Sequence, residues 1–117
     1  MGNIIRIPSG GGTSITGTGV ATTGNNQNLE SSVIDSRGKQ VSYGMSKGAY
    51  VSDYAYASAY IYGSDDMQTW NKVDGISGGP NTAYCKIGTS TRYRYYKCKV
   101  TSGRTNNASS AYVFVSE

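Results

Sequence analysis

Apolar and polar side chains alternate along the segment Arg92–Val100, which reads Arg-Tyr-Arg-Tyr-Tyr-Lys-Cys-Lys-Val. Because successive side chains of a β-strand point to opposite faces, this pattern predicts a strand with one buried face and one wet face. The side chains expected in a core are Tyr96, Cys98 and Val100. Those expected in solvent are Tyr95, Lys97 and Lys99.

Other short extended segments are separated by turn residues. Residues 49–62 alternate small and aromatic side chains, and Tyr, Val and Ser at this density favour a strand over a helix. Turn signals such as Gly63–Asp66 recur about every 8 to 12 residues, which is the spacing of an all-β sandwich. The further predicted strands are 33–41 (two short pieces around a turn), 69–73, 82–87, 93–101 and 110–116.

The composition also favours strands. The 117 residues fit one domain and contain 16 Gly and 11 Tyr, but Leu29 is the single leucine. A helical protein of this size would need Leu-rich faces to bury, whereas Tyr, Val and Thr suit a pleated surface. A core built largely of tyrosines should be thin, so we expect modest stability alone and further stabilisation from neighbouring subunits.

The N-terminal quarter has a different character. Residues 8–28 carry no charge and almost nothing apolar, so this stretch alone cannot offset its own ordering entropy. One interpretation is a disordered tail. The other is an extended arm that adds a strand to another subunit through an apolar tip formed by Ile4, Ile5 and Ile7, with Arg6 between them as part of the binding arm. The predicted organisation is therefore an arm over residues 1–28 and a β-sandwich over residues 29–117.

The chain has a net charge of +4 that is unevenly spread, since residues 81–104 contain six basic residues and no acidic one. A basic face suits nucleic acid, an anionic glycan or an acidic protein, although lysines and arginines also protect exposed strands from aggregation. No stretch is apolar enough for a signal peptide or a membrane helix, so we expect synthesis in the cytoplasm of the cell that produces the chain, and no membrane partner. The basic residues are Lys86, Arg92, Arg94, Lys97, Lys99 and Arg104.

The sequence contains no recognisable catalytic motif. Histidine is absent, which removes the commonest general base and the commonest metal ligand. The adjacent carboxylates Asp65 and Asp66 are interpreted as turn residues, because neighbouring side chains point apart. Cys85 and Cys98 are expected to be free, buried thiols, with a disulfide between them as the alternative. We therefore expect a protein that is not an enzyme and holds no cofactor or metal.

Three stretches of the C-terminal part, residues 60–78, 81–84 and 95–103, together resemble the immunoglobulin-like modules of bacteria and bacteriophages. The resemblance extends over residues 49–116. It implies an antiparallel immunoglobulin-like sandwich, in which a tyrosine two residues before a cysteine ties down a corner and the last two strands form a hairpin. The cysteine expected on the second strand is absent, and Trp70 sits one strand later than in antibody domains.

The short, Gly-, Ser-, Thr- and Tyr-rich chain with its N-terminal arm also resembles small decoration (head auxiliary) proteins of phage capsids. That resemblance implies a non-enzymatic structural virion protein on the outer shell of the phage head. Its partners would be the major capsid protein and copies of itself, as dimers or trimers.

Two other functions are considered. The first is a carbohydrate-binding or host-adhesion module on a phage particle or fibre, whose aromatic rings stack on host surface glycans. The second and least favoured is binding of single-stranded nucleic acid by the basic strand. The surface residues proposed for binding are Trp70, Arg92, Tyr93, Tyr95, Lys97 and Lys99, with Tyr43 and Tyr50 as further rings.

Overall fold

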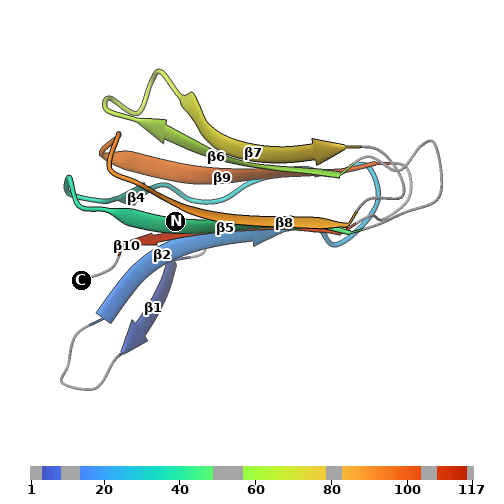
Figure 1. Cartoon of the computed structure of the whole chain (residues 1–117), viewed down its shortest axis with the longest axis horizontal. Coiled ribbons are helices and arrows are strands. Elements are labelled where there is room, and N and C mark those ends of the chain that lie inside the picture. The colour runs from blue at the N-terminus through green and yellow to red at the C-terminus, as the bar shows by residue number, and fades with distance from the viewer. Residues whose placement is uncertain (1–3, 9–13, 49–56, 79–82, 104–107, 116–117) are drawn as a thin grey trace.

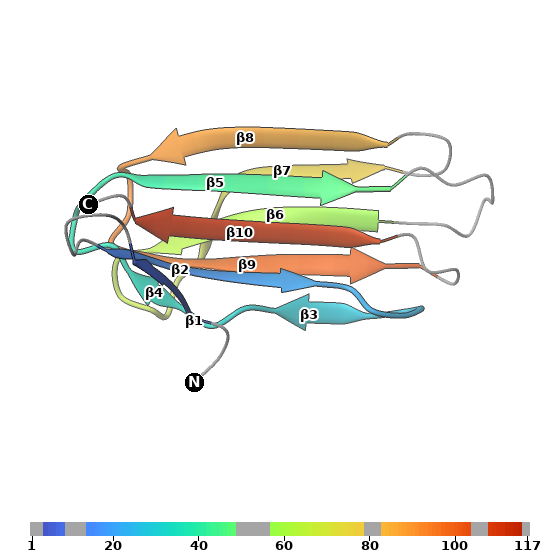
Figure 2. The same ribbon diagram turned by 90° about the horizontal axis from the view of Figure 1, so that it is seen from below.

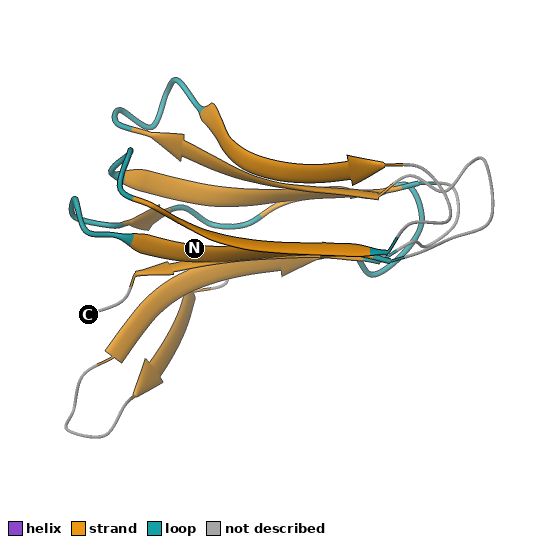
Figure 3. Cartoon of the chain, viewed as in Figure 1, coloured by secondary structure: helices purple, strands orange, loops and turns teal. Residues whose placement is uncertain are grey.

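A computed structural model describes residues 4–8, 14–48, 57–78, 83–103 and 108–115. These residues form strands and connecting loops (Figure 3). The strands are β1 (Ile4–Pro8), β2 (Ser14–Ala21), β3 (Asn28–Glu30), β4 (Ile34–Asp35), β5 (Val41–Lys47), β6 (Ala57–Ser64), β7 (Asn71–Gly78), β8 (Tyr84–Ser90), β9 (Tyr95–Ser102) and β10 (Ser109–Val115).

Two antiparallel sheets pack face to face, so the predicted all-β sandwich is confirmed (Figure 1). One sheet has the order β1-β2-β10-β5-β8, and the other has the order β3-β9-β6-β7 with β4 also paired to β9. Figure 2 shows the long strands lying side by side along the long axis of the molecule. We call the sheet that contains β10 the β10 sheet, and the sheet that contains β9 the β9 sheet.

The strand order differs from the immunoglobulin-like order that the sequence resemblance implied. In an immunoglobulin domain the last two strands form a hairpin within one sheet, whereas here β9 and β10 lie in opposite sheets. The chain also changes sheet between β2 and β3, β4 and β5, β5 and β6, β7 and β8, and β8 and β9. This repeated crossing within the described residues is the wrapped arrangement of a jelly roll.

Half of the predicted N-terminal arm belongs to the sandwich. Residues 16–21 of β2 pair with β10, so the body begins near Ser14 rather than at residue 29. The small residues that look like a linker are needed there, because a Cβ at Gly17 would lie 2.7 Å from the Cβ of Phe114. The β1–β2 hairpin points away from the β9 sheet in Figure 1.

The core contains the residues that the alternation in β9 predicted. Tyr96, Cys98 and Val100 are all fully buried, while the residues between them are half-exposed. The Tyr96 hydroxyl accepts a hydrogen bond from the Tyr93 N–H (3.0 Å) and shares one with the Ser90 hydroxyl (2.9 Å). The tyrosine therefore ties down the β8–β9 corner, as predicted.

A polar side-chain network links β7 and β8, which are edge strands of the two sheets. The Tyr43 hydroxyl donates to Asp74 Oδ2 (2.6 Å), and Lys86 Nζ donates to Asp74 Oδ1 (2.8 Å). Burial, reinforced by the Asp74 carboxylate, raises the pKa of Tyr43 to about 12. Burial also acts to raise the pKa of Asp74, but the hydrogen bonds from Lys86 and Tyr43 outweigh it and hold that pKa below its ordinary value.

Candidate functional site

The outer surface of the β9 sheet gathers lysines and aromatic rings, and we call it the lysine face. In the sheet register Lys99 lies opposite Tyr60 of β6, and Lys97 lies opposite Tyr62. Tyr62 is in turn opposite Lys72 of β7, so a central aromatic strand has lysines on both sides. The lysine face comprises Tyr60, Tyr62, Trp70, Lys72, Lys97 and Lys99.

The ammonium groups of the lysine face lie over aromatic rings. Lys97 Nζ is 4.4 Å from the ring centroid of Trp70, and Lys72 Nζ is 4.3 Å from that of Tyr60. Such cation–π contacts orient the charge and cover one face of each ring. Lys97 also pairs with Glu30 (Nζ to Oε1, 2.9 Å). A ligand that approaches these two rings therefore meets ammonium groups before it meets a bare aromatic surface.

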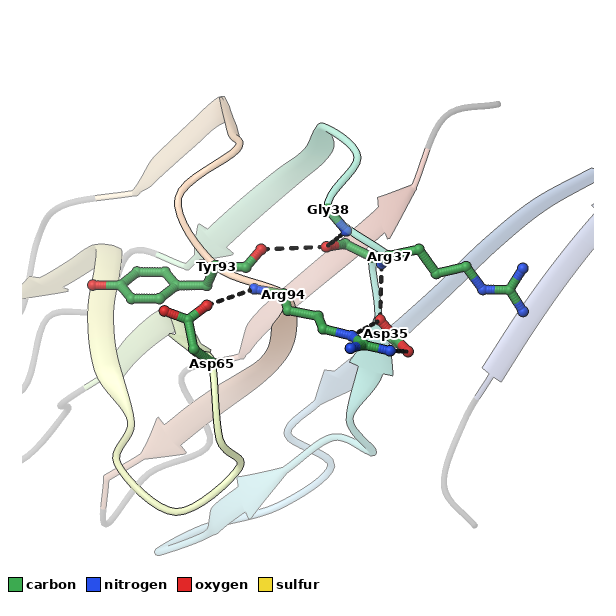
Figure 4. A network of polar contacts seen from close by, with 7 residues as sticks. Asp35, Arg37, Gly38, Asp65, Tyr93 and Arg94 are labelled. Carbon is green, nitrogen blue, oxygen red and sulfur yellow. Dashed lines mark hydrogen bonds and ion pairs between the residues drawn. The ribbon is translucent and has the colours of Figure 1, made fainter.

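A second feature is a hollow of about 490 Å³ at the end of the sandwich where three turns meet. Figure 4 shows part of its polar network. The Arg94 guanidinium donates to both oxygens of Asp35 (3.1 Å each), and the Arg94 N–H donates to Asp65 Oδ1 (3.2 Å). We call it the arginine hollow; it is lined by Arg37, Gly38, Asp65, Thr91, Arg92, Tyr93 and Arg94.

The charges in the arginine hollow hold the turns together. The hydrogen bond from Arg94 is the largest influence on Asp35 and lowers its pKa, and Asp35 in turn raises the pKa of Arg94. The Ser36 hydroxyl donates to the Tyr93 carbonyl (3.2 Å). A carboxylate with a lowered pKa is a weak general base, so these groups serve structure better than proton transfer.

A third feature is the outer surface of the β10 sheet, where most outward residues are small. We call it the small-residue face. The Tyr112 and Phe114 rings stack on it, 5.8 Å apart. Tyr112 lies over Gly44, where a Cβ would be 2.5 Å from the ring. The outward residues of its described part are uncharged: Gly17, Gly19, Ala21, Ser42, Gly44, Ser46, Cys85, Ile87, Thr89, Ser110, Tyr112 and Phe114.

Ile87 is the most exposed large apolar side chain of the described residues. It is 77 % exposed on β8, beside Tyr112 at 43 %. Ile87 and Tyr112 border a shallow hollow of about 160 Å³ on the small-residue face. The register places Ile87 opposite Gly44, which lies under the outward Tyr112 ring, so Ile87 points outward as well. The sequence pattern alone did not indicate a binding role for it.

The structure brings together some of the residues predicted to bind. Arg92 and Tyr93 line the arginine hollow, and Tyr95 lies beside it under the Arg94 guanidinium (5.2 Å to the ring centroid). Trp70, Lys97 and Lys99 belong instead to the lysine face. The predicted binding residues therefore divide between two places.

Two further rings were predicted to contact a glycan; the prediction for one is wrong, and the other ring lies outside the described residues. The prediction for Tyr43 is wrong, because this ring points into the core and its hydroxyl binds Asp74. Tyr50 lies outside the described residues. The backbone of the predicted docking segment pairs with β2 of the same chain, and its docking on another subunit stays a prediction; this segment is Ile4, Ile5, Arg6 and Ile7.

The two cysteines are both free, as expected, but only one is buried. Cys98 lies in the core, where burial raises the pKa of its thiol to about 12. Cys85 is exposed, so the prediction of a second buried thiol is wrong. The reason is that Cys85 sits on the outward side of β8, which is the edge strand of its sheet.

The interpretation of Asp65 and Asp66 as turn residues agrees with the structure. Asp66 Oδ1 accepts hydrogen bonds from the Gln68 and Thr69 N–H groups (2.8 and 2.9 Å), which lower the pKa of this carboxyl. Among the described residues no three His, Cys, Asp or Glu side chains are grouped so as to hold a metal ion. Nor do these residues include a helix with the length and apolarity needed to cross a membrane.

No protein-family model matches this chain, and no curated protein matches its sequence. One similar solved structure is described by the words "Bacillus endospore appendages form a novel family of disulfide-linked pili". It is 8 % identical in sequence, and the alignment covers 99 % of this chain and 90 % of that chain with a TM-score of 0.47.

Proposed function

We propose that this chain is a non-enzymatic structural subunit that associates with copies of itself through the small-residue face and the adjoining edge of β8. The observation that carries the proposal is the exposure of Ile87 at 77 % on an uncharged outer sheet surface. Full burial of an isoleucine side chain stabilises by about 2 kcal/mol, so a second copy that covers Ile87 gains directly.

The distribution of charge supports a second copy as the partner. The chain has a net charge of +4, so most encounters between two copies are repulsive. The described outward residues of the small-residue face carry no charge, and two such faces can meet without repulsion between them. A surface that is complementary to itself suits a two-fold contact between identical subunits.

The edge of β8 adds a directional component. Within the described residues β8 pairs with β5 on one side only. Its other side therefore presents backbone N–H and C=O groups that can bind a further strand. Both features belong to β8, but the edge faces along the plane of the sheet and Ile87 faces out of it, so they offer contacts in two directions.

The larger particle that we propose for this subunit is a phage head, with the major capsid protein as the second partner. This part rests on the sequence resemblance to decoration proteins and on the residues 4–7 segment as the attachment point. Electron microscopy of the particle with which the chain co-purifies is its test. Labelled chain on a head surface supports it, and labelled chain on a fibre or on no particle contradicts it.

Self-association is tested by sedimentation velocity over a range of protein concentrations. We expect Ile87→Lys to weaken association at least tenfold, because it places a charge in the uncharged contact. Met67→Lys is the matched control, since Met67 is also exposed (49 %) but lies in the turn between β6 and β7, two strands of the opposite sheet. A wild-type chain that stays monomeric at millimolar concentration, or equal losses in the two variants, refutes the proposal.

A further inference from the structure

We infer that the lysine face is a second binding site, independent of self-association, and that its ligand is an acidic polysaccharide. The site is the outer surface of β9, β6 and β7. It lies on the sheet opposite to the one that carries Ile87, so both surfaces can be occupied at once.

The first step of the argument is charge. Three lysines point out of the lysine face, and the acidic side chain among its neighbours is Glu30, which pairs with Lys97. Within the described residues no carboxylate lies within ion-pair distance of Lys72 or Lys99, although Glu30 faces Lys99 across the β3–β9 register. The face therefore keeps an excess of positive charge that an anionic ligand can neutralise.

The second step is the arrangement of the charges on a flat surface. Lys97 and Lys99 are two residues apart on one strand, which separates their Cα atoms by about 7 Å. Lys72 lies across β6 from Lys97, two strand spacings or about 10 Å away. Charges spread in this way contact several units of an extended polymer better than they surround a single small anion.

The third step concerns the hydroxyl groups. Next to the lysines the register places Ser77, Ser58 and Thr101 in one outward row across β7, β6 and β9. The Ser58 and Thr101 hydroxyls are hydrogen-bonded to each other. Hydroxyl groups beside ammonium groups match a ligand that carries both hydroxyls and acids, which is the chemistry of a uronic acid polymer.

The fourth step separates a saccharide from a nucleic acid. Single-stranded nucleic acids bind basic surfaces by stacking their bases on free aromatic faces. Here Lys97 covers the Trp70 ring and Lys72 covers the Tyr60 ring, so two of the three rings of the lysine face are covered and Tyr62 is the third. A ligand that needs acids and hydroxyls, and does not need stacking, therefore fits the lysine face better.

The experiment measures binding of polygalacturonate to the full chain by biolayer interferometry at low and physiological salt. Dextran is the neutral control polymer, and an oligo(dT) strand represents nucleic acid. We expect polygalacturonate to bind, dextran not to bind, and the Lys72→Gln/Lys99→Gln double variant to lose at least tenfold in affinity. Affinity should also fall as salt rises, because the contact is ionic.

The control variant Arg37→Gln/Lys39→Gln removes the same net charge from the β4–β5 turn. We expect the affinity of this control variant for polygalacturonate to stay within about twofold of the wild-type affinity, because lowering the net charge has only a small general effect on binding. Equal losses in the two double variants, no binding of polygalacturonate, or tighter binding of oligo(dT) overturns the inference. Ile87→Lys should keep its affinity for polygalacturonate, so failure of the proposed assembly and failure of this site can be told apart.

Discussion

The two outer faces of this sandwich are built in the same way but carry different chemistry. On each face an aromatic ring lies over a glycine of the next strand, Tyr112 over Gly44 and Tyr60 over Gly75. The residues around the first ring are uncharged and small, and those around the second include lysines. The comparison teaches that the fold supplies flat surfaces and that the outward residues decide what each surface binds.

The inward residues of the two sheets are by contrast alike. β5 buries Val41 and Met45, and β9 buries Cys98 and Val100. Because side chains alternate along a strand, the core places few demands on the outward positions. The two faces could therefore acquire separate roles without a change in the core.

The largest expected difference concerns the two thiols, since one lies on the small-residue face and the other behind the lysine face. Cys85 should react with a thiol reagent at pH 8 as fast as an exposed thiol, whereas Cys98 should react roughly a thousandfold more slowly, because an opening that costs about 4 kcal/mol is needed first. Absorbance after addition of Ellman's reagent measures both rates. The single variants Cys85→Ser and Cys98→Ala assign them.

Thiol labelling also sharpens the comparison of the faces. At concentrations where the chain associates, the rate at Cys85 should fall, while polygalacturonate should leave it unchanged. A Cys85 rate that does not depend on protein concentration would place the contact between copies elsewhere.

The next effect in size comes from filling the glycine under each ring. Gly44→Val and Gly75→Val should each lower the free energy of unfolding by about 1–3 kcal/mol, because the added side chain displaces Tyr112 or Tyr60. Chemical denaturation measures both. Ser42→Val is the control, since it adds bulk at an outward β5 position that already has a Cβ.

The two glycine variants should differ in function in spite of their similar stability. Gly44→Val is expected to weaken self-association and to keep polygalacturonate binding, and Gly75→Val the reverse. Loss of both functions in either variant would mean that the faces are not independent.

The smallest effect concerns the Asp74 network at the edge that joins the two sheets. Asp74→Asn should cost about 1 kcal/mol at neutral pH, through the ion pair with the partly exposed Lys86. The pKa of Asp74 is lower in the folded chain than its ordinary value, so its contribution is present above about pH 4 and is lost as the pH falls. Thermal unfolding should therefore show the wild type and the variant converging in acid.

The same network predicts the opposite behaviour in base. Tyr43 has a pKa of about 12, above its ordinary value of 10.0, so the contribution of its neutral phenol is complete below pH 10 and is lost as the pH rises toward 12. Tyr43→Phe should lack this alkaline phase. Its persistence in the variant would assign the phase to another group.

Some of the fold could be predicted from local pattern alone. The buried and exposed sides of β9 follow from its alternation, and the turn at Asp66 follows from its short polar residues. The strand order could not be predicted, because a short connection between two strands such as β9 and β10 can close a hairpin or cross between sheets with the same residues. The Gly-rich β2 was interpreted as an arm, since glycines that seat Tyr112 and Phe114 look the same in sequence as glycines of a linker.

The candidate sites show a similar division. The lysines of β9 were predicted to be outward, but their neighbours Tyr60 and Lys72 depend on register between strands. The burial of Tyr43 could have been predicted from the sequence, because Tyr43 shares the parity of Val41 and Met45 along the strand. The exposure of Cys85 and Ile87 depends on β8 being an edge strand, which only the topology reveals.

The packing of the Tyr112 ring against Gly44 has a consequence for how two copies of the chain align. Strands rich in glycine and serine offer few features that fix how far one surface slides along another. Ile87 is the most exposed apolar side chain on this surface. It can fit into a depression of the neighbouring copy and so fix the position of one surface relative to the other. Shortening it to alanine should thus broaden the range of offsets between neighbouring copies, even where the copies still adhere.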